Sequence, residues 1–257
     1  MKFDVYFHAP FDMLLKHLKD IAAHHINLEI YMNPALLDCL PLKEMGKVKN
    51  FCLEEDIRTS CHGPYIDLNP GSEDPKVRSL TRERFVQSIQ FCSKMGIKNL
   101  VLHTGYSPVF HEAIKDIWFE TSLDLWKEIK TIAEEKEIKI AIENCLENSP
   151  EIVIRLLDEI GSENFGMCFD IAHFNVFGDK PVLDCFDICA DKVFEIHLSD
   201  NNGDRDSHLA FGKGNINFQQ IFHRLKEKDL NPIVTVEAMS IEDVIYNIEY
   251  LGNVDWF

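Results

Sequence analysis

Eight short runs rich in β-branched and aromatic residues recur along the chain, and longer segments separate them. The runs cover residues 2–7, 27–32, 57–61, 99–103, 139–143, 165–170, 193–198 and 232–237. In the segments between them, apolar residues recur every three or four positions, as at Phe85, Ile89 and Cys92, which indicates amphipathic helices. Alternating strands and helices favour a parallel sheet, and eight such pairs in 257 residues match the number and length of a (β/α)8 TIM barrel.

A doubly wound open sheet is the alternative α/β fold. The sequence disfavours it because no GxGxxG segment follows the first run, and because eight evenly spaced repeats are unusual for an open sheet. No linker interrupts the alternation, so we predict a single domain over residues 1–257.

Composition and charge narrow the classes of protein. Hydrophobic residues make up 46% of the chain, which is enough for a full core. The longest apolar runs last about five residues, against the roughly 20 needed to cross a bilayer, so we predict no membrane span. The N-terminal stretch resembles neither a secretory signal nor a transit peptide, which favours a cytoplasmic location. The net charge of −17 repels nucleic acid at long range unless a basic face or bound metal reverses the field.

The ends of the predicted strands carry residues of the types that bind metals. On a TIM barrel these ends form the active-site face. The residues in or just after them are His8, His62, His103, Glu143, Asp170, His173, His197 and Glu237. Asp206 and His208 lie in the loop after the seventh strand.

Any one of these residues, taken alone, is more often a hydrogen-bonded structural residue than a metal ligand. Several carboxylates in one barrel mouth, however, would repel one another or take up protons unless cations were present. Imidazole together with carboxylate suits zinc or manganese better than calcium or magnesium. We therefore predict a divalent-metal site of zinc or manganese at this face.

The segments around these residues resemble the xylose-isomerase-like TIM barrels, a superfamily that includes endonuclease IV and many sugar or sugar-phosphate isomerases and epimerases. The resemblance covers almost the whole chain. The segments are Cys61-His62-Gly63-Pro64-Tyr65, Val101-Leu102-His103-Thr104-Gly105, Ile142-Glu143-Asn144, Cys168-Phe169-Asp170-Ile171-Ala172-His173, Ile196-His197-Leu198-Ser199-Asp200, Asp206-Ser207-His208, Gly212-Lys213-Gly214-Asn215-Ile216 and Val236-Glu237.

The resemblance implies two ligand sets, and both match this chain in residue type. Endonuclease IV holds three zinc ions with nine side chains, which correspond here to His62, His103, Glu143, Asp170, His173, His197, Asp206, His208 and Glu237. The isomerases and epimerases hold one divalent metal with four side chains, which correspond to Glu143, Asp170, His197 and Glu237. One to three ions are therefore compatible with the sequence.

The number of ions bears on the substrate. Four ionised carboxylates carry a charge of −4, so one divalent ion leaves −2, two leave 0 and three leave +2 when the histidines are neutral. A single ion therefore predicts a neutral sugar or polyol, whereas three ions could hold a phosphodiester and generate hydroxide.

We expect a metal-dependent sugar or sugar-phosphate isomerase or epimerase as the leading hypothesis. Glu143 and Glu237 would exchange protons on opposite faces of the substrate, and Asp170 and His197 would be ligands only. The candidate substrate-binding residues are Lys213, His8 and Asp200, the last with a role in orienting a metal ligand as the alternative. Glu29 and Tyr31 line either the pocket or the core.

Two other functions remain open. An apurinic-site endonuclease with a trinuclear zinc site is the second hypothesis and the one in which nucleic acid is a partner. The loop of residues 31–37 carries no cation, and residues 145–149 lack the Gly-rich stretch of the nuclease branch, so both disfavour duplex binding. The third hypothesis is a non-catalytic metal-binding barrel.

The expected partner is a small carbohydrate or sugar phosphate. We expect no association with a membrane, and the sequence leaves the oligomeric state open.

Overall fold

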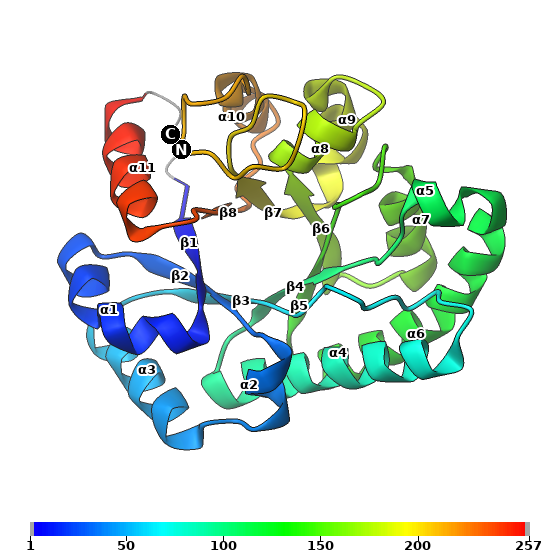
Figure 1. Ribbon diagram of the computed structural model, residues 1–257, viewed down its shortest axis with the longest axis horizontal. Helices are drawn as coiled ribbons and strands as arrows, with labels where there is room; N and C mark the ends of the chain where they lie inside the picture. Colours follow the sequence, from blue (N-terminus) through cyan, green and yellow to red (C-terminus); the bar gives the residue numbers. More distant parts are fainter. Residues whose placement is uncertain (1–2, 255–257) are drawn as a thin grey trace.

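Eight parallel strands close into a barrel in the order of the sequence, and helices surround it (Figure 1). The structure is a computed structural model and describes residues 3–254. The strands are β1 (Val5–Pro10), β2 (Asn27–Tyr31), β3 (Thr59–His62), β4 (Asn99–His103), β5 (Lys139–Glu143), β6 (Phe165–Asp170), β7 (Val193–Leu198) and β8 (Ile233–Val236). Parallel pairing of β1 with β8 closes the ring, and the predicted TIM barrel is confirmed.

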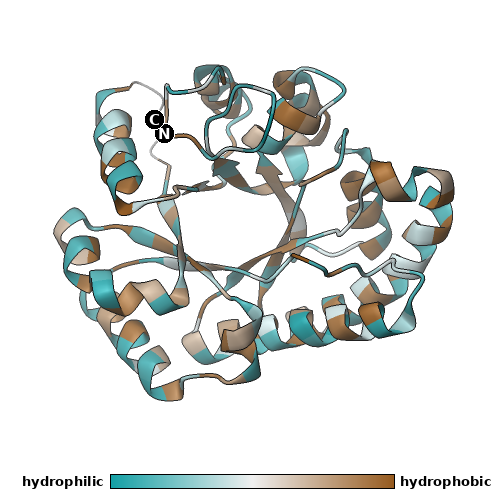
Figure 2. Ribbon diagram, viewed as in Figure 1, coloured by the Kyte–Doolittle hydropathy of each residue, from teal (hydrophilic) through white to brown (hydrophobic). Residues whose placement is uncertain are grey.

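The helices fill the connections between the strands. They are α1 (Phe11–His24), α2 (Pro34–Asp38), α3 (Leu42–Glu54), α4 (Pro75–Met95), α5 (Pro108–His111), α6 (Lys115–Glu135), α7 (Glu151–Ile160), α8 (Ile171–Phe177), α9 (Val182–Cys189), α10 (Phe218–Glu227) and α11 (Ile241–Asn253), with short 3-10 turns at residues 112–114 and 190–192. The outer helices contain both hydrophobic and hydrophilic residues, as expected for amphipathic helices (Figure 2). Within residues 3–254, no helix combines the length and apolar character needed to cross a membrane.

Local sequence explains where α4 begins and ends. The side chain of Asp74 caps the helix by accepting a hydrogen bond from the backbone N–H of Lys76, and Pro75 occupies the first turn. Gly96 ends it in the left-handed region at φ 80°, where glycine is favoured. Phe85 and Ile89 are buried, as their helical spacing predicts.

The first strand differs from the prediction by three residues. It was expected over residues 2–7, whereas β1 runs from Val5 to Pro10, and Lys2 lies outside the described residues. The reason is pairing: His8 and Ala9 are in register with Glu29 and Ile30 of β2, so the strand continues through them. His8 is therefore part of the barrel wall.

The barrel interior below the strand ends is divided between apolar and polar side chains. Val101, Ala141 and Cys168 form a small buried cluster, with the partly buried Phe194 packed against it. Each of the three lies two residues before a strand-end residue and therefore faces the same side of its strand. On the other strands Glu29 and Glu195 are buried instead. This polar half of the interior lies directly beneath the candidate site.

Gly166 on β6 provides a test of this packing. A Cβ atom at this position would lie 2.3 Å from the ring of Phe194, closer than any van der Waals contact. We expect Gly166→Ala to lower the free energy of unfolding by about 1–3 kcal/mol, because the partly buried ring would have to move away from the cluster that it packs against. Gly46→Ala is the matched control, since nothing lies within 4 Å of its Cβ position. Chemical denaturation of the two variants measures the difference, and equal stability of both would contradict the packing.

Candidate functional site

A pocket of about 290 Å³ opens among the C-terminal ends of the strands. Its lining consists mostly of imidazoles, carboxylates and tyrosines: His8, Pro10, Tyr31, His62, Tyr65, His103, Glu143, Cys145, His173, Asp206, His208, Glu237 and Ala238. None of these lining residues is Lys or Arg. The structure thus brings seven of the nine sequence-predicted ligands into the pocket lining itself.

The other two predicted ligands, Asp170 and His197, lie directly behind this lining. Strand register brings them together, because Asp170 of β6 is opposite His197 of β7. Glu143 of β5 is likewise opposite His103 of β4. Asp170 and His197 are fully buried, and Glu143 is 1% exposed. Residues from four consecutive strands therefore converge at this end of the barrel.

Glu143 is the centre of the first group of side chains. Its Oε2 atom lies 3.0 Å from Nε2 of His62 and 2.9 Å from Nε2 of His103. The Nδ1–H of His62 donates a hydrogen bond of 2.7 Å to the carbonyl oxygen of Gly63. A neutral His62 ring then presents the lone pair of Nε2 to a carboxylate oxygen, which is repulsive unless a cation or an extra proton lies between them.

A second group next to the first repeats this arrangement, and its His173 Nδ1 lies 3.4 Å from Glu143 Oε1. The Nδ1–H of His173 donates to the carbonyl oxygen of Asn144 at 2.8 Å, which leaves its Nε2 facing Asp206 Oδ2 at 3.3 Å. The same Asp206 oxygen is 2.9 Å from Nε2 of His208. Nδ1 of His208 lies 3.4 Å from Glu237 Oε2.

His197 faces both carboxylates that the sequence predicts to be catalytic. Its Nδ1 atom lies 3.6 Å from Glu143 Oε2 and 3.6 Å from Glu237 Oε1. Metal–ligand distances of about 2.0–2.2 Å place neighbouring ligand atoms roughly 3–3.5 Å apart, so these separations are close to what one shared cation requires.

Unpartnered buried atoms support the same conclusion. Four buried ligand-type atoms have no hydrogen-bond partner within the described part of the chain: Asp170 Oδ2, His197 Nδ1, Asp206 Oδ1 and Glu237 Oε2. Buried polar atoms are nearly always paired, so a cluster of unpaired ones calls for an explanation. The buried clusters of histidine, glutamate and aspartate have the donor atoms and spacing to hold a divalent metal.

Without a cation, the site balances its charge through protons. Burial raises the pKa of the Asp170 carboxyl to about 7, although His173 lowers it. Burial lowers the pKa of the His208 imidazole, but Asp206 and Glu237 raise it to about 9. Burial raises the pKa of Glu143, but His103 and His197 lower it well below its usual range. Protons held by the imidazoles therefore compensate the buried carboxylates, and a divalent ion would replace them.

The three predicted substrate-binding residues occupy different places. His8 lines the pocket. The Asp200 carboxylate is buried and accepts hydrogen bonds from the backbone N–H groups of Asn201, Gly212, Gly214 and Ile216, so it fixes the loop after β7. Lys213 lies outside the lining, with Nζ 5.0 Å from the ring centre of Tyr246. Of the three, the structure brings only His8 to the ligands.

Tyr65 and Cys145 line the pocket without having been predicted as site residues, whereas Tyr31 was expected to line either the pocket or the core. The ring of Tyr65 stacks on that of His103, with the ring centroids 4.5 Å apart. The ring centroid of Tyr31 lies 6.4 Å from that of Tyr65. Cys145 also lines the pocket, and burial raises the pKa of its thiol to about 12. In the sequence, the one signal that Tyr65 lines the pocket was its position three residues after His62. The two tyrosines form an aromatic wall beside the ligands.

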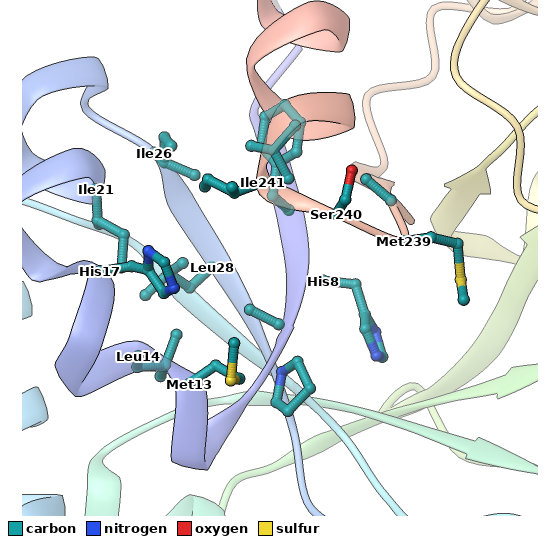
Figure 3. A pocket seen from close by; sticks show the side chains of 15 residues that line it. His8, Met13, Leu14, His17, Ile21, Ile26, Leu28, Met239, Ser240 and Ile241 are labelled. Atoms are coloured by element: carbon teal, nitrogen blue, oxygen red, sulfur yellow. The ribbon is translucent and has the colours of Figure 1, made fainter.

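A second pocket of about 150 Å³ lies beside the first (Figure 3). It shares His8, Pro10 and Ala238 with the polar pocket. Its remaining lining is largely apolar, as the side chains of Leu14 and Ile26 illustrate. None of the nine predicted metal ligands lines this second pocket.

Comparison with known proteins gives a consistent assignment. The family model for the xylose isomerase-like TIM barrel matches residues 15–252. An uncharacterized protein of Methanocaldococcus jannaschii is 31% identical over 203 residues, which cover 76% of this chain and 69% of that protein. A probable endonuclease 4 of Ureaplasma urealyticum is 26% identical over 251 residues, which cover 85% of this chain and 80% of that protein.

Among solved structures, the crystal structure of a D-tagatose 3-epimerase-like protein superimposes with a TM-score of 0.84 at 28% identity. The match covers 96% of each chain. The similarity therefore extends over the complete barrel.

Proposed function

Because the chain belongs to the family of xylose isomerase-like TIM barrels, we propose that it is a divalent-metal-dependent isomerase or epimerase of a sugar or sugar phosphate. The observation that carries this proposal is the position of His197 Nδ1, which is buried, lacks a hydrogen-bond partner and lies 3.6 Å from both Glu143 and Glu237. Three candidate metal-ligand side chains, from β5, β7 and the residue directly after β8, thus lie close enough together to share one ion.

Four residues would hold the metal: Glu143, Asp170, His197 and Glu237. Two or more carboxylates with one imidazole suit zinc or manganese. When bound, the metal would polarise a substrate carbonyl and a neighbouring hydroxyl group, which acidifies the C–H bond between them. His62, His103, His173, Asp206 and His208 would either bind hydroxyl groups of the substrate or hold a further ion.

Glu143 and Glu237 are the proposed proton-exchanging residues. They come from the ends of β5 and β8, and both carboxylates face the same imidazole. One would remove the proton from the substrate carbon, and the other would return a proton on the opposite face. Tyr65 and Tyr31 would contact the sugar ring from the aromatic wall, and His8 would bind a hydroxyl group.

Solvent-exchange experiments test this proposal. The metal-loaded protein, incubated with a panel of ketoses in deuterated water, is expected to incorporate deuterium at the carbon next to the carbonyl, because the abstracted proton exchanges with solvent before it is returned. Mass spectrometry and proton NMR measure the incorporation. Absence of exchange across a broad panel, with metal bound, would contradict the isomerase proposal.

An endonuclease IV-like apurinic-site endonuclease is the second candidate. The observation in its favour is the second ligand group of His173, Asp206 and His208, which gives the pocket more donors than one ion needs. Elemental analysis showing three zinc ions per chain, together with cleavage of an abasic duplex, would favour this candidate. Deuterium exchange with one bound ion and an intact duplex would favour the isomerase.

A further inference from the structure

Glu29 of β2 contacts two imidazoles from beneath the polar pocket. The residue is fully buried. Its Oε1 atom lies 2.9 Å from Nδ1 of His8, and its Oε2 atom lies 3.2 Å from Nε2 of His197. His8 is in register with Glu29 on the neighbouring strand, whereas His197 comes from β7, which does not pair with β2. One carboxylate therefore connects two separate parts of the barrel wall.

The direction of these hydrogen bonds follows from the geometry at Glu29. Each of its two oxygens faces a different imidazole nitrogen, and a carboxylate oxygen accepts a hydrogen bond from an imidazole N–H. Both imidazoles must then donate, His8 through Nδ1–H and His197 through Nε2–H. In a neutral ring the other nitrogen of His197, Nδ1, keeps its lone pair.

The free nitrogen of His197 is the one that faces the proposed metal position. Nδ1 is buried, has no hydrogen-bond partner in the described part of the chain, and lies 3.6 Å from Glu143 Oε2. If the only ring proton were on Nδ1, Nε2 would present its lone pair to a carboxylate oxygen at 3.2 Å. That arrangement is repulsive, so Glu29 excludes it.

We propose that Glu29 is a positioning residue that fixes the tautomer and the orientation of His197 and, at the same time, of His8, so that His197 offers Nδ1 to a divalent cation. The inference rests on the proposed metal-dependent function. Hydrogen bonds of this kind to a ligating histidine raise its basicity, and their loss typically lowers metal affinity about 10–100-fold.

Glu195 provides a matched control for this proposal. It is 1% exposed and also lies in the barrel interior. Its Oε1 atom accepts a hydrogen bond of 2.5 Å from the Thr235 hydroxyl, and the same atom is 3.8 Å from Nε2 of His197, beyond hydrogen-bond distance. Glu29→Gln and Glu195→Gln therefore make the same chemical change at nearly equal burial, but only the first alters a carboxylate that lies within hydrogen-bond distance of His197.

Metal affinity and the tautomer of His197 are the two measurements. Glutamine has one acceptor oxygen, so in Glu29→Gln one of the two imidazoles loses its acceptor. We expect the affinity for Zn²⁺ or Mn²⁺, measured by competition with a chelating dye, to fall about 10–100-fold in Glu29→Gln and to stay closer to wild type in Glu195→Gln. Ring ¹⁵N correlations of the metal-free and zinc-loaded wild type should report the proton on Nε2 of His197, with assignment by His197→Asn.

The outcomes separate this inference from the proposed function. Equal losses of affinity in the two variants, or a wild-type His197 without a proton on Nε2, would overturn the role of Glu29. The wild-type tautomer decides the question even if Glu29→Gln fails to fold. A wild-type protein that binds neither metal would instead overturn the proposed function, while the presence or absence of a proton on Nε2 of His197 in the metal-free form would still test Glu29.

Discussion

Removal of the metal is expected to abolish the proposed activity and to lower the thermal stability of the protein. The buried carboxylates and imidazoles would hold the ion only in the folded state, because the unfolded chain does not bring them together. At a free metal concentration of 1,000 times the Kd, the binding equilibrium contributes about 4 kcal/mol to the free energy of unfolding. For a chain of this size that corresponds to roughly 8–16 °C in Tm.

Differential scanning fluorimetry with and without a chelator measures this shift. Addition of Zn²⁺ or Mn²⁺ to the chelated protein should restore both Tm and activity, and Mg²⁺ or Ca²⁺ should not, because imidazole ligands favour the former pair. The site would not be a metal centre if the metal-free and metal-loaded proteins melted at the same temperature.

Glu143→Gln is expected to produce the largest loss among single substitutions. The carboxylate is a proposed ligand and a proposed proton acceptor, and its oxygens contact three imidazoles within 3.4 Å. Loss of a general base lowers kcat about 10²–10⁴-fold, and the weakened metal site adds to that loss. Deuterium incorporation into the ketose substrate and dye competition for the metal measure the two effects separately.

Glu147→Gln is the control for this substitution. Glu147 lies four residues farther along, is 1% exposed and does not line the pocket. Its carboxylate accepts hydrogen bonds from the Thr104 hydroxyl and from the backbone N–H of Cys145. We expect a loss of stability in Glu147→Gln with metal affinity retained. Equal metal affinity in Glu143→Gln and wild type would contradict the proposed ligand set.

Much of the fold could be predicted from the sequence because strands and helices have different residue periods. The bounds predicted for β4, β5, β6 and β7 match the structure. The end of β1 could not be read in this way, since Ala9 and Pro10 resemble a loop and become part of the strand only through pairing with β2. Local pattern thus determines the number of strands, and partner strands determine where some of them end.

The candidate site could likewise be predicted in part from the sequence. The ligands at strand ends could be predicted because every parallel strand of a barrel ends on the same face, so His62, Glu143 and Asp170 had to lie near one another. Asp200 and Lys213 are in the same motifs, yet the folded loop turns the first toward backbone N–H groups and the second toward Tyr246. The path of a loop depends on contacts that its own sequence does not encode.

By itself, then, the sequence determined the barrel, the chemistry of its mouth and the types of ligand available there. Only the tertiary structure decided which of those groups contact one another and which side chains of the barrel interior hydrogen-bond to them. Glu29 lies between Leu28 and Ile30 in a short buried strand, and from the sequence it could be assigned to the pocket or the core but not to a partner. Its partner His197 is 168 positions away, and barrel closure alone brings the two within hydrogen-bond distance.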